Sequence, residues 1–312
     1  MRALVVSNML PDSEHPERGR FVRDQASALR HLEGVTVELY EFPPGARALV
    51  RAARDLRNRF RGQRFDVVHA HFGLSAWPAL AVRARARALT VHGTDVSHPR
   101  TRLATRAVLP AIGLLAAASE PLVEEIPGRR ARARAKVLPC GVDTARFQAI
   151  PRAQARTELG LDMARPCLLF AADPARVEKR HDRARALADA LEAELLTLGG
   201  VDPMRVPLYV NAANAVIVPS DREGFGLAAL EALACDVPVL ATPVGVHRQA
   251  LEGIEGCLCA PFELELWGAA VATHVAQPDP RVEGRARAER YSAERMAQRV
   301  LTAWRSLVAA GG

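Results

Sequence analysis

The stretch from Ala215 to Cys235 constrains the fold more than any other part of the chain. Its first four residues, Ala-Val-Ile-Val, are an apolar run typical of a buried parallel strand, and Pro219-Ser220 ends that run. The glycines of Gly224-Phe225-Gly226 favour a turn, and residues 227–234 are rich in strong helix formers. A helix that begins behind a glycine turn presents unpaired N–H groups and the positive end of its dipole. This segment therefore predicts a phosphate-binding site at the start of the helix.

Two glutamates flank the turn, Glu223 before it and Glu231 within the predicted helix. Their separation of ~12 Å along a helix, at about 1.5 Å per residue, exceeds the ~5–9.5 Å between paired hydrolytic carboxylates. It suits an extended ligand with hydroxyl groups at both ends and a diphosphate between them, as in a sugar nucleotide. On spacing alone, an exposed Glu223 and an ordinary helical Glu231 remain the simpler interpretation.

The wider context of these glutamates resembles a known motif. Residues 223–235, with Val237–Thr242 after them, resemble the E-x7-E donor motif of the retaining glycosyltransferases of family 4. The resemblance implies the α/β GT-B fold, with two Rossmann-like, doubly wound parallel-sheet domains facing across a cleft. It also implies a hexosyltransferase that moves a sugar from a UDP- or GDP-linked donor to a hydroxyl acceptor with retention of configuration. No cofactor or metal is implied, because protein cations stabilise the leaving diphosphate.

Length and charge agree with two domains. The 312 residues suit two units of ~150 residues each, and the apolar fraction of 49% is ample for two cores. We expect an acceptor-side domain over 1–150, a donor-binding domain over 151–290, and a terminal helix over 291–312 that packs back on the first domain. The apolar stripe of that helix predicts packing rather than a cofactor site. The five cysteines, in apolar surroundings and with no signal pattern ahead of them, indicate reduced thiols in a cytoplasmic protein.

The first half carries a strand, a loop and a helix near its start, but the G-x-G-x-x-G pattern of dinucleotide-binding proteins is absent. A nicotinamide dehydrogenase is therefore disfavoured. By resemblance, Gly19 belongs to the loop over the donor diphosphate.

Three histidines, His69, His71 and His92, follow predicted strands, but no carboxylate or cysteine lies at ligand spacing near them, so we reject a metal site. The segment around His69 and His71, and the His-Gly-Thr-Asp segment that ends at Asp95, both resemble segments of the family. His69 is expected in the core or between domains. By resemblance, His92 contacts the donor sugar or its leaving phosphate, and Asp95 supports the acceptor side.

The second half departs from the family at one turn. Asp173-Pro174 occupies the place of a Gly-Arg pair, with Arg176 displaced toward Lys179. A Lys ammonium reaches a phosphate as a point charge, so Lys179 and Arg176 are expected to bind the diphosphate. Asn214 also stands where the family usually has Asp.

The remaining site roles follow from the resemblance. Glu223 is expected to orient the sugar hydroxyls, and Glu231 the ribose hydroxyls. The predicted donor-binding set is completed by residues of the turn, the helix start and a neighbouring loop: Ser220, Gly224, Phe225, Gly226, Leu227 and Gly199.

Positive charge is concentrated in the first half. Residues 1–150 hold 24 Arg and Lys against 14 Asp and Glu, whereas the remainder holds 18 against 21. Arginines recur at helical spacing over 47–64, which predicts a helix with a basic face. That face is either simply solvated or a peripheral contact with anionic lipid at the inner face of a membrane, where many relatives use lipid-linked acceptors in polysaccharide biosynthesis. We interpret the Ala-Arg repeats at 83–88 and 129–135 as coding bias, and basic residues without interleaved aromatics do not predict nucleic-acid binding.

Two alternatives stay open at this level. One is a sugar-nucleotide epimerase or hydrolase on the same fold, since cleft histidines could supply acid and base groups. The other is a non-catalytic relative that binds a nucleotide, which the altered Asp173-Pro174 turn motivates.

Overall fold

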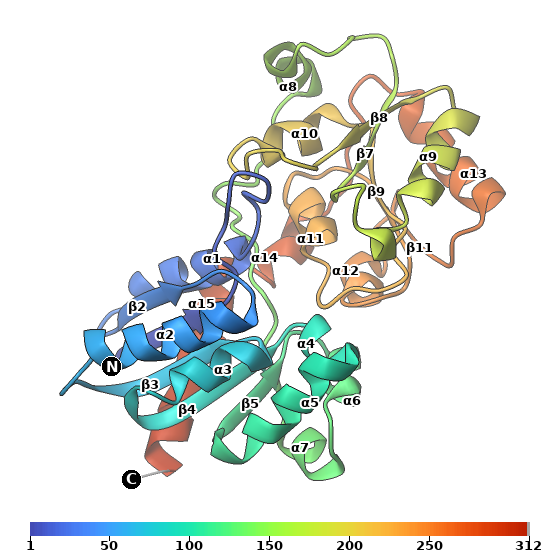
Figure 1. Ribbon diagram of the computed structural model, residues 1–312. Coiled ribbons are helices and arrows are strands. Elements are labelled where there is room, and N and C mark those ends of the chain that lie inside the picture. The colour runs from blue at the N-terminus through green and yellow to red at the C-terminus, as the bar shows by residue number, and fades with distance from the viewer. Residues whose placement is uncertain (311–312) are drawn as a thin grey trace. The chain divides into compact units, whose positions relative to one another are not determined.

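The computed structural model describes residues 1–310, which form two α/β units (Figure 1). Unit 1 comprises Met1–Ser13, Arg18–Gly141 and helix α15 (Ala293–Ala310). Unit 2 comprises Glu14–Glu17 and Val142–Ser292. In both units the paired strands run parallel, and helices connect them, so the predicted class of doubly wound parallel-sheet domains is confirmed.

The sheet of unit 1 has the order β2-β1-β3-β4-β5-β6. Its strands are β1 (Arg2–Ser7), β2 (Thr36–Glu41), β3 (Arg64–His71), β4 (Arg83–Val91), β5 (Leu114–Ala117) and β6 (Lys136–Val137). The helices are α1 (Arg20–Arg30), α2 (Ala46–Arg59), α3 (Gly73–Ala79), α4 (Thr94–Ser97), α5 (Pro99–Val108), η1 (Leu109–Ala111), α6 (Glu120–Glu125), α7 (Arg129–Arg134) and α15.

Helices α1 and α15 pack together over one face of this sheet, whereas α3 contacts β1, β3 and β4 and packs against α2 (Figure 1). The predicted stripe of α15 lies in the core: Met296, Val300 and Trp304 are at most 2% exposed, and Leu307 packs against them. The interpretation of this stripe as packing is therefore confirmed.

The Ala-Arg repeat at 83–88 forms the first two thirds of β4. Arginines at 83 and 85 are exposed while Ala86 and Ala88 are buried, so the repeat has the alternation of a strand with one covered face. Arginine stems and alanines both fit a pleated sheet, and the interpretation of the repeat as coding composition rather than function stays a prediction.

The sheet of unit 2 has the order β11-β10-β9-β7-β8. Its strands are β7 (Cys167–Phe170), β8 (Glu194–Thr197), β9 (Ala215–Val218), β10 (Val239–Ala241) and β11 (Leu258–Cys259). The helices are α8 (Arg152–Leu159), η2 (Val177–Lys179), α9 (His181–Ala190), α10 (Val206–Ala212), α11 (Leu227–Ala234), α12 (His247–Leu251), α13 (Leu264–Val275) and α14 (Arg285–Glu289). Helices α9 and α13 contact each other and the sheet, and Leu187 and Trp267 lie in this core with Phe170 and Ile217 of the strands.

The strand order of unit 2 reverses direction at β7. The chain passes from β7 to β8 on one side and then returns to β9 on the other side of β7. The loops that leave the carboxyl ends of β7 and β9 therefore diverge, and such a switch point is where open α/β sheets bind ligands.

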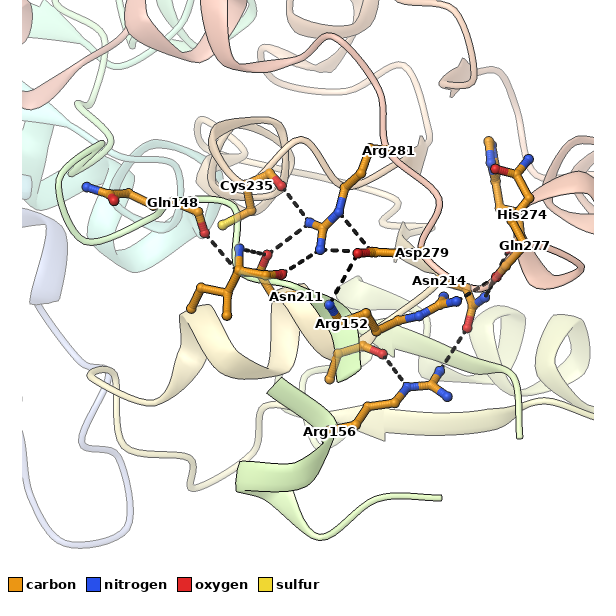
Figure 2. A network of polar contacts seen from close by, with 12 residues as sticks. Gln148, Arg152, Arg156, Asn211, Asn214, Cys235, His274, Gln277, Asp279 and Arg281 are labelled. Carbon is orange, nitrogen blue, oxygen red and sulfur yellow. Dashed lines mark hydrogen bonds and ion pairs between the residues drawn. The ribbon is translucent and has the colours of Figure 1, made fainter. Parts of the chain in front are cut away.

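The segment 142–150, which we expected in the first domain, belongs to unit 2. The side chain of Asn211 accounts for this, because both ends of its amide group bond to backbone groups of the segment (Figure 2). Its Nδ2 donates to Gln148 O at 3.0 Å, and its Oδ1 accepts from Ile150 N at 2.8 Å and from Arg281 Nη1 at 2.9 Å. Arg281 Nη1 also donates to Cys235 O at 2.8 Å, which ties the connector to the end of α11.

Asn214 occupies the neighbouring part of the same network (Figure 2). Its Oδ1 accepts from Cys167 N and Arg156 Nη2, both at 3.0 Å, and its Nδ2 donates to His274 O at 2.9 Å. An aspartate here could not make the last bond, because an ionised carboxylate has no donor. The departure from the usual Asp is thus explained by packing in this chain.

Candidate active site

A buried ion pair joins the two loops at the switch point of unit 2. Lys179, which ends η2 after β7, places Nζ 2.6 Å from both carboxylate oxygens of Glu223, in the loop after β9. Ser220 Oγ donates to Glu223 Oε1 at 2.8 Å. The Lys179 and Glu223 side chains are only 13% and 8% exposed. Three of the predicted site residues, Lys179, Glu223 and Ser220, are therefore brought together.

The environment keeps Glu223 ionised. Burial raises the pKa of Glu223, but the charge of Lys179, the proximity of His247 and the hydrogen bonds from Lys179 and Ser220 lower it, and the net shift is downward. Since the carboxylate is an acceptor for several donors at once, it is suited to hydrogen bonds from hydroxyl groups.

The start of α11 lies directly after Glu223 in the chain. Gly226 is the N-cap residue with φ of +101°, and it has no side chain to cap the first turn. The first N–H groups of the helix have no intrahelical partner, so they and the dipole favour an anion at this end. Gly224, Phe225 and Leu227 form the turn and first residue beside it, as the sequence predicted.

The turn rests on His247 of α12, a residue that the sequence analysis did not single out. A Cβ built on Gly226 would overlap the Nε2 and Cδ2 atoms of His247, so the close approach requires glycine. His247 is fully buried, and its Nδ1 lies 2.9 Å from Thr242 O. Because a carbonyl only accepts, Nδ1 carries the proton and donates it.

Thr242 links this histidine to the ion pair. Its Oγ1 donates to Ser220 O at 2.5 Å, and Ser220 in turn bonds Glu223. Thr242 and His247 thus support the site from the loop after β10. The only sequence signal for them was their position after an apolar strand, on either side of the Gly245 turn.

Arg176 is not brought to this cluster. Its Nη2 lies 2.7 Å from Glu178 Oε1, in a pair whose side chains are 55% and 47% exposed. The Asp173-Pro174 turn explains this course, because Asp173 Oδ1 accepts from Ala175 N at 2.9 Å and its carbonyl accepts from Arg176 N. This turn leaves the Arg176 side chain at the surface, away from the Lys179–Glu223 pair.

Two further predicted residues of unit 2 lie near these elements. Gly199 follows β8, and a Cβ on it would meet Asp173 Oδ1 at 3.1 Å and Pro174 Cδ at 3.2 Å, so it packs closely against the altered turn. Glu231 is the fifth residue of α11 and is partly exposed.

The remaining two predicted residues, His92 and Gly19, belong to unit 1. Gly19 has φ of +69° and is the N-cap of α1, where its carbonyl accepts from Val22 N and Arg23 N. His92 follows β4, and its ring packs between Phe21 and Phe72 at centroid distances of 4.7 and 4.8 Å.

A chain of hydrogen bonds fixes the protons of three histidines in unit 1, His69, His71 and His92. Trp304 Nε1 donates to His69 Nδ1 at 3.1 Å, so His69 carries its proton on Nε2, 2.8 Å from Thr90 Oγ1. Gln25 Nε2 donates to His71 Nε2 at 3.3 Å, so His71 donates from Nδ1 to His92 Nε2 at 2.9 Å. His92 therefore carries its proton on Nδ1.

Burial keeps these histidines neutral. It lowers the pKa of His69 to about 3, and together with neighbouring histidines it lowers the pKa of His71 and His92. Asp95 is buried beside them and accepts from the backbone N–H groups of His92, Gly93 and Gly73 at 2.9–3.1 Å. Its carboxylate holds the loop that carries His92, and an acceptor-side role for it stays a prediction.

No three His, Cys, Asp or Glu side chains within residues 1–310 are grouped as metal ligands. A site that works without a metal remains a prediction from the sequence.

Comparison with protein families covers most of the chain. Residues 4–146 match the family described as Glycosyltransferase Family 4, and residues 167–295 match that described as Glycosyl transferases group 1. Among curated proteins, the chain is similar to the D-inositol 3-phosphate glycosyltransferase of Pseudarthrobacter chlorophenolicus, at 28% identity over 334 residues that cover 90% of this chain and 78% of the relative. The enzyme of the same name from Actinosynnema mirum is 30% identical over 67% of this chain and 63% of its own length.

Solved structures share the architecture. The sucrose-phosphate synthase of Thermosynechococcus elongatus has a TM-score of 0.75 at 21% identity, covering 99% of each chain. HepE of Anabaena, solved in complex with UDP-glucose, has a TM-score of 0.69 at 18% identity, covering 98% of this chain and 100% of its own. At these identities the likeness concerns the fold.

We predict that Gly226→Ala destabilises the protein more than Gly160→Ala does. Both glycines have positive φ, but a Cβ on Gly160 meets no atom within 4 Å, whereas one on Gly226 overlaps His247. Backbone strain costs ~1 kcal/mol in Gly160→Ala and more in Gly226→Ala, whose φ of +101° lies beyond the left-handed helical region, and overpacking adds ~1–3 kcal/mol in Gly226→Ala. Urea denaturation of both variants measures the difference.

Adding His247→Ala to Gly226→Ala removes the overlapping ring, so the double variant should be less destabilised than the sum of the two single variants. Equal destabilisation of Gly226→Ala and Gly160→Ala would contradict the close packing of the turn on His247.

A second prediction concerns acid stability. The folded protein holds His69 with a pKa of about 3 against 6.5 in the unfolded chain, so the unfolded state binds more protons below pH 6.5. The free energy of unfolding is thus unaffected by this group above about pH 6.5 and falls as the pH decreases, by ~2 kcal/mol at about pH 5. Urea denaturation across this range measures the slope.

His69→Gln should flatten the slope by that amount, and His31→Gln, which changes an exposed histidine of unit 1, should leave it as it is. An unchanged slope in His69→Gln would show that His69 is not held neutral by burial.

Proposed function

This chain is a family 4-like glycosyltransferase of the GT-B fold, and from that premise we propose that it transfers a hexose from a nucleoside-diphosphate sugar to a hydroxyl acceptor with retention of configuration. The observation that carries the proposal is the buried Lys179–Glu223 pair at the switch point of unit 2, directly before the start of α11. This arrangement offers a cation, helix amides and a hydroxyl-binding carboxylate in one place.

The chemistry of the donor fits these groups. As the bond between the sugar and the phosphate breaks, negative charge develops on the diphosphate. Lys179 and the N–H groups of Phe225, Gly226 and Leu227, with the α11 dipole, would stabilise that charge in the transition state. Glu223 would orient the sugar hydroxyls and Glu231 the ribose hydroxyls. No step in this account requires a metal.

The identity of donor and acceptor is a further part of the proposal. HepE is described with bound UDP and UDP-glucose, which supports a UDP-linked donor here ahead of a GDP-linked one. The names of the curated relatives favour a small phosphorylated polyol as the acceptor ahead of a glycan or lipid-linked saccharide. His92 would donate from Nδ1 to the sugar or its leaving phosphate, and Gly19 would lie beside the diphosphate.

We predict that Lys179→Ala and Glu223→Ala each lower kcat/KM for transfer from a labelled UDP-hexose by ~10²–10³-fold, the usual cost of removing one group that stabilises transition-state charge. The matched control is Lys136→Ala, which removes the other lysine of the chain, exposed in β6. This control should keep native kcat/KM. The anomeric configuration of the product, read by NMR, tests retention.

The other outcomes separate the alternatives. Turnover unchanged in both variants would contradict the site. Release of the nucleoside diphosphate without a glycosylated product would indicate a hydrolase, and conversion of the donor sugar would indicate an epimerase. Binding of UDP without consumption of any donor would favour a non-catalytic relative, which the exposed course of Arg176 also motivates.

Peripheral contact with an anionic membrane is proposed for the basic segment 47–64. Helix α2, the turn after it and the first residue of β3 expose seven arginines, at 47, 51, 54, 57, 59, 61 and 64, beside the apolar Val50, which is 54% exposed. Each basic side chain near an anionic surface contributes ~1 kcal/mol. No helix within residues 1–310 has the length and apolar character needed to cross a membrane.

We predict that the protein floats with vesicles that contain phosphatidylglycerol and not with vesicles of phosphatidylcholine alone. Changing Arg51, Arg54 and Arg57 to Glu should abolish flotation, because it reverses the charge of the exposed face. The same charge change at Arg100, Arg129 and Arg130, exposed outside this segment, is the control and should have a smaller effect. Equal losses would indicate that net charge, rather than α2, decides binding.

A further inference from the structure

The two cations predicted for the site in unit 2 are both paired with carboxylates. Lys179 is already neutralised by Glu223, and Arg176 is paired with Glu178 at the surface. A bound diphosphate would add several negative charges to a largely buried position, and such charge is stable only where it meets opposite charge or hydrogen-bond donors. The α11 amides supply donors but no full charge.

One buried side chain beside this position, His247, has a hydrogen-bonding atom without a partner in the part of the chain that the structure describes. His247 Nδ1 donates to Thr242 O, but Nε2 has no hydrogen-bond partner among the described residues and is covered from solvent. Across residues 1–310 it is the only imidazole nitrogen in that condition. The Nε2–Cδ2 edge of the ring lies against the N-cap residue Gly226, so this unpartnered nitrogen is placed beside the start of α11.

We propose that His247 takes up a proton when an anionic diphosphate binds at the start of α11, and that the resulting imidazolium supplies the second positive charge of the site. The inference rests on the proposed function, since it takes the diphosphate of a nucleotide sugar as the ligand. The proton comes from solvent and binds Nε2, and no covalent bond of the ligand changes. Nδ1 keeps its proton and its bond to Thr242.

The groups that face His247 explain why the proton arrives with the ligand. Burial lowers the pKa of His247, Glu223 and the Thr242 carbonyl raise it, and Lys179 lowers it, with a net downward shift. His247 is therefore neutral in the free protein at neutral pH. An anion at Gly226 adds attraction for a positive charge on the ring and raises the pKa in the complex.

The hydrogen-bonded histidines of unit 1, His71 and His92, do not offer this response. His92 Nε2 already accepts from His71, and His71 Nε2 accepts from Gln25, so a proton taken up at either place would break an existing hydrogen bond. His247 gains a proton without such a loss.

Proton uptake by His247 makes the affinity for the diphosphate depend on pH in one direction. A group whose pKa rises on binding makes the affinity highest at low pH, and the affinity falls as the pH increases from the pKa of the free protein to that of the complex. Each unit by which the pKa rises corresponds to a tenfold gain in affinity at the acid end of this range.

The experiment measures binding of UDP and of inorganic pyrophosphate by calorimetry, in buffers of different ionisation enthalpy and across pH. We expect the native protein to take up protons on binding. If the pKa of His247 rises by about one unit, the affinity of the native protein should gain about tenfold over that of His247→Asn as the pH falls from about 8.5 to below the pKa of His247 in the free protein. Asparagine keeps a donor for Thr242 O and cannot titrate. Protonation of the ligand is common to both proteins and cancels.

His274→Gln is the matched control. His274 is also buried in unit 2, but its Nε2 lies 2.7 Å from Gly256 O, away from α11, and Gln retains that donor. This variant should keep the native proton uptake. The ring ¹⁵N shifts of His247 in the native protein give a readout that does not depend on whether a variant folds: both nitrogens should become protonated when pyrophosphate is added.

The outcomes distinguish this inference from the proposed function. Binding of both probes without proton uptake, or with the same uptake in His247→Asn, overturns the role of His247 and leaves the glycosyltransferase proposal standing. Proton uptake with pyrophosphate but no binding of UDP or other nucleoside diphosphates supports His247 as an anion-linked base and overturns the nucleotide donor. Failure of every probe to bind overturns both.

Discussion

The ion pair between Lys179 and Glu223 is the interaction on which the site depends. It joins the loops after β7 and β9 at the point where the strand order of unit 2 reverses, and both side chains are almost fully buried. A buried charge that loses its partner costs several kcal/mol, so the two loops are held in one arrangement as long as both residues are present. The pair therefore organises the start of α11 as well as the charges around it.

Support for this pair comes from a third loop. Thr242 and His247, after β10, contact Ser220 and the Gly226 turn, so three adjacent parallel strands end in one connected set of polar groups. Unit 1 uses its histidines in a different way. There, Trp304 and Gln25 hold a stacked series of neutral imidazoles, and only the last of them, His92, is partly exposed. The polar groups of unit 2 surround an ion pair, whereas the histidines of this series in unit 1 are kept neutral.

The sequence was sufficient wherever a local pattern reflects a local cause. The apolar run 215–218, the glycine turn and the helix formers that follow predicted β9 and α11 with their observed bounds, since each pattern matches one element. It was insufficient where partners lie far apart along the chain. Residues 142–150 join unit 2 through hydrogen bonds with Asn211 and Arg281, and no local sequence pattern predicts such long-range contacts. His247 was missed for the same reason, because its importance comes from Gly226, 21 positions earlier in the chain.

A structure of the protein crystallised with UDP tests the central claim most directly. The account predicts that the β-phosphate lies within hydrogen-bond distance of Lys179 Nζ and of the first N–H groups of α11, with the ribose hydroxyls toward Glu231. A diphosphate bound anywhere else, with the Lys179–Glu223 pair and the start of α11 free of ligand, would contradict it.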